Sequence, residues 1–223
     1  RKRDQDTLAI WEICGLKYLF SKNKGAQPKM LNIQCQCGGT ALQWRERKEL
    51  WRLECCCSDC SAGMRFLHET KGGPQPPNHQ MLDTLWLPND FSVTRGLPNI
   101  GVVKLSADSR NTLFYCKECG TSLITDHVVY QDKVVITQIQ NYAQFQGMSS
   151  EPHMAVKARH FVGDVDPHSI DSLPPFAGPQ SEVYGGVSQT LVDVFPTLYQ
   201  QGATGEMNAQ KLAELQGITY AGV

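Results

Sequence analysis

The sequence contains no uninterrupted hydrophobic run long enough to span a membrane. Its most apolar stretch, residues 8–20, is broken by Glu12, Gly15 and Lys17, whereas a spanning helix needs about 20 mainly apolar residues. The chain also lacks three common enzyme motifs: the phosphate-binding Gly-x-x-x-x-Gly-Lys-Ser/Thr loop, the Gly-x-Ser-x-Gly elbow and the His-Glu-x-x-His helix. We therefore expect no membrane span and no chemistry of these three classes.

Positive and negative side chains are nearly balanced in number. The 223 residues carry 21 Lys and Arg against 22 Asp and Glu, which gives a net charge of −1. Nucleic-acid-binding proteins usually present a strongly basic surface, so we expect no nucleic-acid partner. The charges are unevenly placed, with net +4 in residues 1–30 and net −6 in residues 161–223. This asymmetry predicts a middle domain between a basic N-terminal and an acidic C-terminal extension.

Cysteine is abundant and clustered. Eight of the nine cysteines fall into three short groups, Cys35 and Cys37, then Cys55, Cys56, Cys57 and Cys60, then Cys116 and Cys119. Disulfide frameworks spread their cysteines, whereas C-x-C and C-x-x-C spacings let several thiolates converge on one ion. An all-sulfur ligand set indicates zinc first and an iron–sulfur cluster second. Reduced thiolates favour an intracellular reducing compartment, the cytoplasm or an organelle matrix, over secretion.

Two of the groups together can complete a metal site. The four sulfurs of this site would come from Cys35, Cys37, Cys116 and Cys119. Four thiolates around one ion is the arrangement of structural zinc, which stabilises a fold and leaves no position open for chemistry. Gly120 directly follows the C-x-x-C pair and permits the tight turn that such a pair needs.

The middle group predicts a second zinc with three sulfur ligands. Because side chains alternate along an extended strand, Cys55 and Cys57 point to one side and Cys56 to the other. Together with Cys60 they leave one coordination position open, as zinc does where it performs chemistry or binds a ligand. Alternatively, a fourth residue closes this site and makes it inert, the candidates being Cys14, Cys56, His68 or a carboxylate.

The cysteine groups belong to a longer series of motifs. In chain order these are Cys35-Gln-Cys37-Gly38-Gly39, Cys55-Cys56-Cys57-Ser58-Asp59-Cys60, Phe91-Ser-Val-Thr-Arg-Gly96, Phe114-Tyr-Cys116-Lys-Glu-Cys119-Gly120-Thr121 and Leu173-Pro174-Pro175-Phe176. At these motifs the sequence resembles the glutathione-dependent formaldehyde-activating enzyme family, which also includes centromere protein V. The resemblance covers residues 31–178. It implies a compact, mainly β, zinc-stabilised domain of the β-tent type. The chain extends beyond this domain at residues 1–30 and 179–223, where the sequence pattern itself predicts short helices.

The resemblance also implies a role for each cysteine group, with two zinc ions per chain. It implies a structural zinc at the four-thiolate site and a second, catalytic zinc, near which glutathione binds, held by Cys55, Cys57 and Cys60. The family commonly has a histidine where this chain has Cys56. A thiol is a poorer base than imidazole near neutral pH, so acid–base chemistry at this position would differ from that of the family.

Two functions are compatible with these features. The first is a zinc-dependent carbon–sulfur lyase that joins glutathione, or another small thiol, to formaldehyde and yields S-hydroxymethylglutathione. Cations that could meet the carboxylates of glutathione are Arg52, Arg65, Lys71 and Arg95. The second is a non-catalytic zinc scaffold, or a subunit of a larger assembly, that docks on a protein partner through residues 1–30 and 179–223. The long, oppositely charged extensions favour this alternative.

The remaining patterns predict a β-rich domain. Short β-branched or aromatic runs bounded by turn residues occur at 102–105, 112–115, 122–124, 128–130 and 133–139. Gln131-Asp132 is placed to turn a hairpin between the last two runs. Helical patterns occur at residues 7–21 and 206–216, both outside the metal domain, and Gly217 ends the second.

Overall fold

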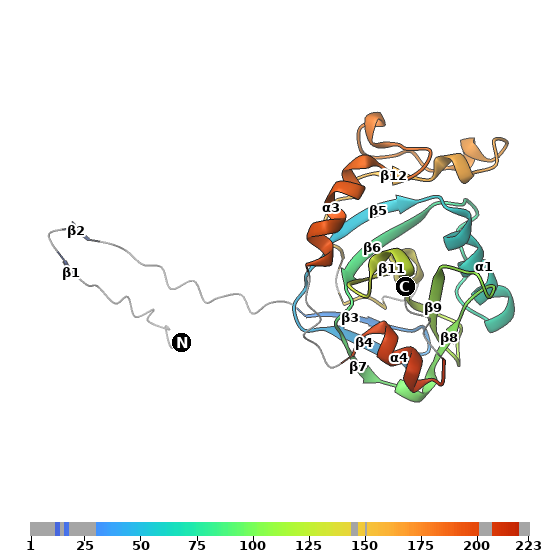
Figure 1. Ribbon diagram of the computed structural model, residues 1–223, viewed down its shortest axis with the longest axis horizontal. Coiled ribbons are helices and arrows are strands. Elements are labelled where there is room, and N and C mark those ends of the chain that lie inside the picture. Colours follow the sequence, from blue (N-terminus) through green and yellow to red (C-terminus); the bar gives the residue numbers. More distant parts are fainter. Residues whose placement is uncertain are drawn as a thin grey trace, which may run out of the picture.

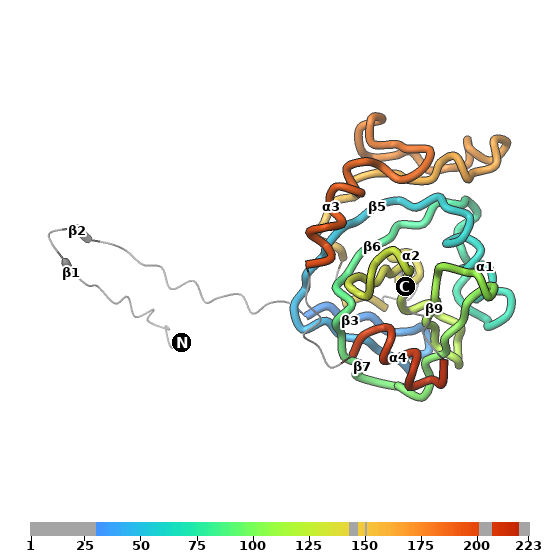
Figure 2. Tube along the Cα trace, viewed as in Figure 1, coloured from blue at the N-terminus to red at the C-terminus, as the bar shows by residue number. Residues whose placement is uncertain are grey.

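The computed structural model describes residues 12–13, 16–17, 30–143, 147–149, 151–200 and 207–218 (Figures 1 and 2). Over these residues the protein is mainly β, with a seven-stranded and a three-stranded sheet, a separate two-stranded hairpin and four α-helices. No helix in these ranges is long and apolar enough to cross a membrane.

The strands and helices have the following bounds. The strands are β1 Glu12–Ile13, β2 Leu16–Lys17, β3 Leu31–Gln34, β4 Ala41–Trp44, β5 Trp51–Cys55, β6 Leu82–Pro88, β7 Ser92–Arg95, β8 Ile100–Val103, β9 Asn111–Cys116, β10 Ser122–His127, β11 Val134–Gln138 and β12 Arg159–His160. The α-helices are α1 Ser58–Lys71, α2 Gln140–Ala143, α3 Gln189–Tyr199 and α4 Ala209–Leu215. Short 3-10 helices occur at Leu97–Asn99, Val128–Tyr130, Val162–Asp164, Ile170–Ser172 and Gln180–Glu182.

The larger sheet has the strand order β12-β5-β6-β11-β10-β9-β8. Its neighbouring strands pair antiparallel except β12 and β5, which pair parallel. The smaller sheet has the order β3-β4-β7 and is antiparallel. In Figure 1 the smaller sheet and α4 lie on the lower side of the view, while α3 and the edge strand β12 of the larger sheet lie on the upper side.

Side chains of the larger sheet alternate between two hydrophobic cores. On β6, Leu85 and Leu87 belong to the first core, whereas Leu82 and Trp86 belong to the second. This alternation follows from the two-residue repeat of a strand, and β9 and β11 alternate in the same way. The first core also takes side chains from the smaller sheet, and the second takes side chains from α1. The cysteine groups are divided between the two cores, with Cys116 in the first and Cys55 in the second.

The C-terminal helices α3 and α4 pack into the two hydrophobic cores. Leu191 and Leu198 of α3 are buried in the second core, and Leu212 and Ala213 of α4 are buried in the first. The hydroxyl of Ser188 caps α3 by accepting the backbone N–H of Leu191 at 3.1 Å. Tube and ribbon views show both helices lying on the strands rather than extending from them (Figures 1 and 2).

Several local predictions are confirmed. The expected strands at 102–105, 112–115, 122–124 and 133–139 overlap β8, β9, β10 and β11. Gln131 and Asp132 have φ values of 48° and 60° and form a turn before β11, but the strands that this connection joins are β10 and β11, not the two expected runs at 128–130 and 133–139. The helix expected at residues 206–216 is α4, and Gly217 follows it with φ 73°.

Three predictions of secondary structure are wrong. Residues 128–130 form a 3-10 helix, not a strand, because His127 Nδ1 accepts the backbone N–H of Val129 at 3.0 Å and starts a helical turn. Residues 31–178, for which no helix was predicted, contain α1 and the short α2. The helix expected at residues 7–21 lies mostly outside the described residues, and the four residues described there form the antiparallel pair β1–β2. Gly15, a poor helix former, separates these two strands in the sequence.

Candidate metal centres

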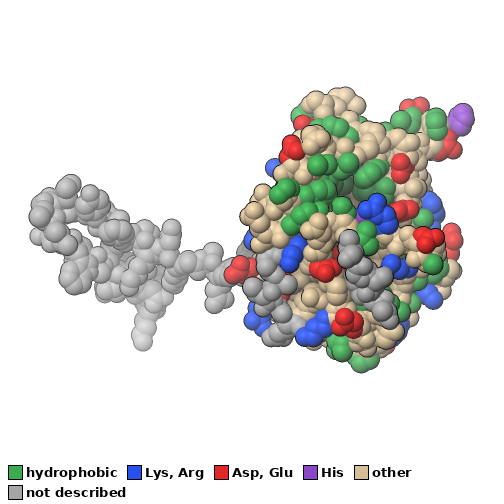
Figure 3. Space-filling view, in the orientation of Figure 1, with side chains coloured by type: hydrophobic (Ala, Val, Ile, Leu, Met, Phe, Trp, Pro, Cys, Tyr) green, Lys and Arg blue, Asp and Glu red, His purple; other side chains and the backbone are tan. Residues whose placement is uncertain are grey.

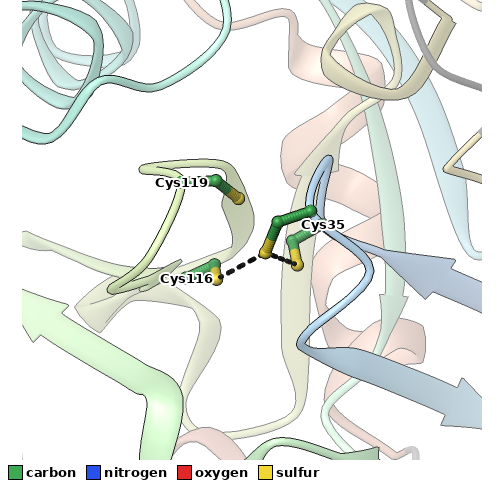
Figure 4. Close-up of side chains that lie close together, drawn as sticks. Cys35, Cys116 and Cys119 are labelled. Carbon is green, nitrogen blue, oxygen red and sulfur yellow. Dashed lines mark hydrogen bonds between the residues drawn. The ribbon is translucent and has the colours of Figure 1, made fainter.

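Cys35 and Cys37, in the turn after β3, lie close to Cys116 and Cys119, at the end of β9 and in the loop before β10. These four residues are called the first cysteine group from here on. All four Sγ atoms, those of Cys35, Cys37, Cys116 and Cys119, lie within 4.8 Å of one another. The Sγ–Sγ distance is 3.3 Å between Cys35 and Cys37 and 3.7 Å between Cys37 and Cys116. Sulfurs about 2.3 Å from a tetrahedral zinc stand about 3.8 Å apart, so this group is compact enough to hold one ion. Figure 4 shows Cys35 facing Cys116 and Cys119 across a short gap.

Backbone and hydroxyl donors surround these sulfurs. The backbone N–H of Thr40 donates to Cys35 Sγ at 3.2 Å, and the Thr40 hydroxyl donates to Cys116 Sγ at 3.5 Å. Such donors stabilise thiolates and orient them toward a metal. Gly120 has φ 62°, and its N–H donates to the carbonyl of Cys116 at 2.8 Å. The C-x-x-C-Gly segment therefore forms the expected turn.

The thiols of the first group share protons unequally. A hydrogen bond from the Cys35 thiol lowers the pKa of Cys119 to about 3. The same bond, together with burial, raises the pKa of Cys35 well above its usual value. A metal ion bound by the group would displace the remaining protons, so its affinity is expected to rise with pH.

The middle cysteine group lies where β5 meets α1. Cys55 ends the strand, Cys57 is the N-cap of the helix and Cys60 lies in its first turn. Their Sγ atoms all lie within 4.8 Å of one another, with 3.3 Å between Cys55 and Cys57 and 3.9 Å between Cys55 and Cys60. These three sulfurs are close enough to hold a metal ion together.

Hydrogen bonds concentrate negative charge on Cys57. Its sulfur accepts from the Cys55 thiol and from the backbone N–H of Cys60, the latter at 3.3 Å. The thiols of Cys55 and Cys60 lower the pKa of Cys57 to about 3, and hydrogen bonds within the group raise the pKa values of Cys55 and Cys60. The N-terminus of α1 also favours a thiolate here, because the first N–H groups of a helix carry partial positive charge.

The residues considered as a fourth ligand lie elsewhere. Cys56 packs with Met81 and Val165 in a small separate cluster, as the alternation of side chains predicts. His68 donates from Nδ1 to the carbonyl of Gly73 at 2.8 Å. Among the described residues, no further Cys, His, Asp or Glu brings a ligand atom within 4.8 Å of all three sulfurs. Cys14 lies outside those residues.

The three cysteines of the middle group line a cavity of about 400 Å³. Apolar side chains from β5, β6, β11, α3 and the 3-10 helix at Val128–Tyr130 form much of its wall, namely Leu53, Trp86, Tyr130, Ile136, Leu191 and Phe195. Its polar lining includes Arg110, Asn111, His127 and His160. A ligand in this cavity would contact the sulfurs at one end and an apolar wall at the other.

His160 also lines the cavity and is not among the residues predicted for the site. It is fully buried, and neither ring nitrogen has a hydrogen-bond partner among the described residues. The parallel pairing of β12 with β5 places it opposite Cys55. Burial lowers the pKa of His160 to about 4, so the imidazole is neutral near pH 7. No local sequence spacing links His160 to the cysteines, and only the pairing of the two strands does.

The cations expected to meet glutathione do not line this cavity. They are Arg52, Arg65, Lys71 and Arg95. Arg52 instead pairs with Asp83 at 2.6 Å, and Arg95 donates to the carbonyl of Gly38 at 2.6 Å. Arg110, which directly precedes β9, is the arginine that lines the cavity. Its position follows from the sheet and could not be read from its neighbours in the sequence.

Comparison with known proteins gives little further information. No family model matches the chain, and no curated protein matches it. Among solved structures, the crystal structure of a Rhodobacter sphaeroides protein is similar at 18% identity and a TM-score of 0.31, covering 49% of this chain and 84% of that chain. A similarity this weak supports no conclusion about family or function. The cysteine groups and the cavity are the features that bear on function.

Proposed function

We propose that both cysteine groups hold zinc and that the chain is a carbon–sulfur lyase-like protein that handles glutathione or a related small thiol. The observation that carries this proposal is the middle group, in which three sulfurs converge on the wall of a cavity. The first group, with four sulfurs that link the two sheets, would then be structural. The proposal also includes a β-tent domain over residues 31–178, as the resemblance to the formaldehyde-activating enzymes implies.

The donor atoms support zinc. Both groups offer only sulfur, and the sulfur–sulfur distances fit a tetrahedral ion of zinc's size. Eight cysteines of the described residues are free thiols, which suits a reducing compartment such as the cytoplasm or an organelle matrix.

The chemistry would depend on positioning more than on acid–base catalysis. A zinc ion held by three sulfurs supplies one open position for an exogenous sulfur and favours its thiolate form. Cys55, Cys57 and Cys60 would hold that ion at the cavity wall, and the apolar side chains around it would exclude water. In the reaction, the thiol sulfur forms a bond to the formaldehyde carbon, and the thiol proton is transferred to the formaldehyde oxygen, which becomes a hydroxyl. The addition is balanced without an oxidant or reductant, and the reverse reaction releases the thiol and formaldehyde.

The alternative, a non-catalytic scaffold, would dock through residues 1–30 and 179–223. Packing of α3 and α4 into the two cores counts against the C-terminal part of this hypothesis, because those residues already cover the domain. We therefore propose the thiol-handling function first.

A native mass spectrum of the purified chain, with and without glutathione, tests the proposal. We expect two zinc ions and one glutathione adduct for the wild type, and loss of the adduct in Cys57→Ser. Exchange spectroscopy by NMR should then show faster interconversion of glutathione, formaldehyde and S-hydroxymethylglutathione with the wild type than with this variant. Binding of a single zinc ion, or an adduct retained in Cys57→Ser, would contradict the proposal.

A further inference from the structure

The lining of the cavity beside the middle cysteine group favours an apolar substituent over the charged groups of glutathione. That tripeptide carries two carboxylates and one ammonium group. The charged side chains that line the cavity are Asp59, Arg110 and Asp164, so acidic groups outnumber basic ones. Because like charges repel, a ligand with two carboxylates gains little from this lining. The wall itself is built mainly from aromatic and aliphatic side chains.

Helix α3 supplies an essential part of that apolar wall. Phe195 stacks on Trp86 with ring centroids 6.0 Å apart and an interplanar angle of 19°. Leu191, one helical turn earlier, is buried and also lines the cavity. Val187, just before the helix, lines it too and is 47% exposed. Apolar side chains thus continue from the buried wall to the surface.

The helix is held in place by polar contacts at both ends. Ser188 caps its N-terminus, and the Tyr199 hydroxyl near its C-terminus donates to the carbonyl of Val129. Figure 3 shows hydrophobic side chains gathered on the surface between α3 and the segment that carries β12. The apolar wall is therefore a fixed part of the site, and its extent suits the substituent of a small ligand.

We propose that the ligand of this cavity is a small thiol with an aromatic or branched aliphatic substituent. Its sulfur would take the open position of the zinc that the middle group would hold, and its substituent would lie against Trp86, Leu191 and Phe195. This inference rests on the proposed thiol-handling function and specifies its substrate class. The cavity of about 400 Å³ accommodates a ring-sized substituent together with the sulfur. Burial of that substituent supplies affinity that a short polar thiol lacks.

Calorimetric titration of the zinc-loaded full chain with three thiols tests this inference. The thiols are phenylmethanethiol, 2-mercaptoethanol and glutathione. We expect phenylmethanethiol to bind at least about tenfold more tightly than either of the others, because its ring leaves water on binding. The zinc content of each sample is measured in parallel, so that a lost metal is not read as lost affinity.

Substitutions on α3 and just before it show which side chains cause the preference for phenylmethanethiol. Phe195→Ala should reduce the advantage of phenylmethanethiol over 2-mercaptoethanol to less than about threefold, because the ring loses its stacking surface. Val187→Ser should reduce it in the same direction, and this exposed position carries little risk to folding. Val192→Ala is the matched control, since Val192 lies on the same helix, is 39% exposed and does not line the cavity. It should leave the ratio unchanged.

The outcomes separate the two proposals. If 2-mercaptoethanol or glutathione binds as tightly as phenylmethanethiol, the apolar substrate class is wrong and the thiol-handling function stands. If no thiol binds although two zinc ions are present, the thiol-handling function itself fails. An unchanged ratio in both Phe195→Ala and Val187→Ser would overturn the role of α3.

Discussion

His160 lies directly opposite Cys55 on the parallel strands β12 and β5, and both residues line one cavity. The imidazole is buried with no hydrogen-bond partner among the described residues. A buried polar group without a partner lowers stability by about 1–3 kcal/mol. Because no hydrogen bond among the described residues accounts for this histidine, we infer that it serves a ligand of the cavity.

We predict that His160→Leu leaves the free energy of unfolding unchanged or raises it by about 1 kcal/mol, since no hydrogen bond is lost. The same variant should weaken binding of the cavity's thiol ligand. The matched control is His68→Leu, which removes the bond from His68 Nδ1 to the carbonyl of Gly73 and should lower stability by about 1 kcal/mol. Urea unfolding and thiol titration check both variants. Equal destabilisation by the two substitutions would show that His160 has a structural partner.

Gly120 and Gly72 provide a test of the turn that carries Cys116 and Cys119. Both have positive φ, 62° and 70°. A Cβ at Gly120 would meet the backbone nitrogen of Gly73 and lie 2.5 Å from the carbonyl oxygen of Lys71, whereas a Cβ at Gly72 would meet nothing within 4 Å. Only the first substitution therefore combines backbone strain with a steric clash.

We predict that Gly72→Ala costs about 1 kcal/mol, from backbone strain alone. Gly120→Ala should cost more than about 3 kcal/mol and lower the zinc content, since the turn must shift. Urea unfolding together with metal analysis measures both effects. Similar losses in the two variants would mean that strain, and not the close approach of the backbones, sets the requirement for glycine at Gly120.

The raised pKa of Asp126 should make the free energy of unfolding depend on pH. Burial, with the Asp132 carboxylate nearby, raises the pKa of Asp126 to about 8, whereas the unfolded value is about 3.9. Between these values the folded chain holds a proton that the unfolded chain has released, so stability falls as pH rises from about 4 to about 8. Its oxygen Oδ2 accepts from Gln210 Nε2 of α4 at 3.3 Å. We predict that Asp126→Asn removes this component of the slope.

Urea unfolding at about pH 6 and about pH 8.5 compares the two proteins over the relevant range. The wild type should lose more stability between these pH values than Asp126→Asn. A milder variant, Asp132→Asn, should reduce the loss only in part, because burial is the larger cause of the shift. Identical pH profiles for the wild type and Asp126→Asn would show that the carboxyl group is already ionised in the folded chain at pH 6.

The two cysteine groups should differ in what they contribute to folding. We predict that Cys119→Ser lowers the free energy of unfolding by several kcal/mol, because its group ties the smaller sheet to the larger one. Cys57→Ser should retain the fold, since serine is a good N-cap and can still accept the N–H of Cys60. Circular dichroism and thermal unfolding measure the contrast. Loss of the fold in both variants would contradict the division into a structural and an open site.

How far the sequence predicts this structure depends on how local each cause is. Within each short run of cysteines, the closeness of the sulfurs is predictable because a C-x-C or C-x-x-C spacing brings them together within one turn of the chain. The strands β9 and β11 are predictable because their β-branched and aromatic runs are bounded by turn residues. In both cases the cause lies within a few residues.

Features that depend on distant contacts are not predictable in this way. Gly63 weakens the helical pattern of α1, yet its lack of a side chain lets the helix approach β9, since a Cβ there would lie 3.0 Å from Leu113. Pro196 likewise argues against α3, which forms because its apolar side chains are buried in the second core. His160 joins the site only through the pairing of β12 with β5, more than 100 residues apart in the chain.

X-ray absorption at the zinc edge tests the central claim most directly, because it counts the sulfurs around each ion. With seven cysteine sulfurs shared between two ions, the zinc-loaded chain should show an average between three and four sulfurs per zinc, at about 2.3 Å. Saturation with phenylmethanethiol should raise that average to four. Four sulfurs per zinc before any thiol is added, or an average that the thiol does not change, would contradict an open thiol-binding site at Cys55, Cys57 and Cys60.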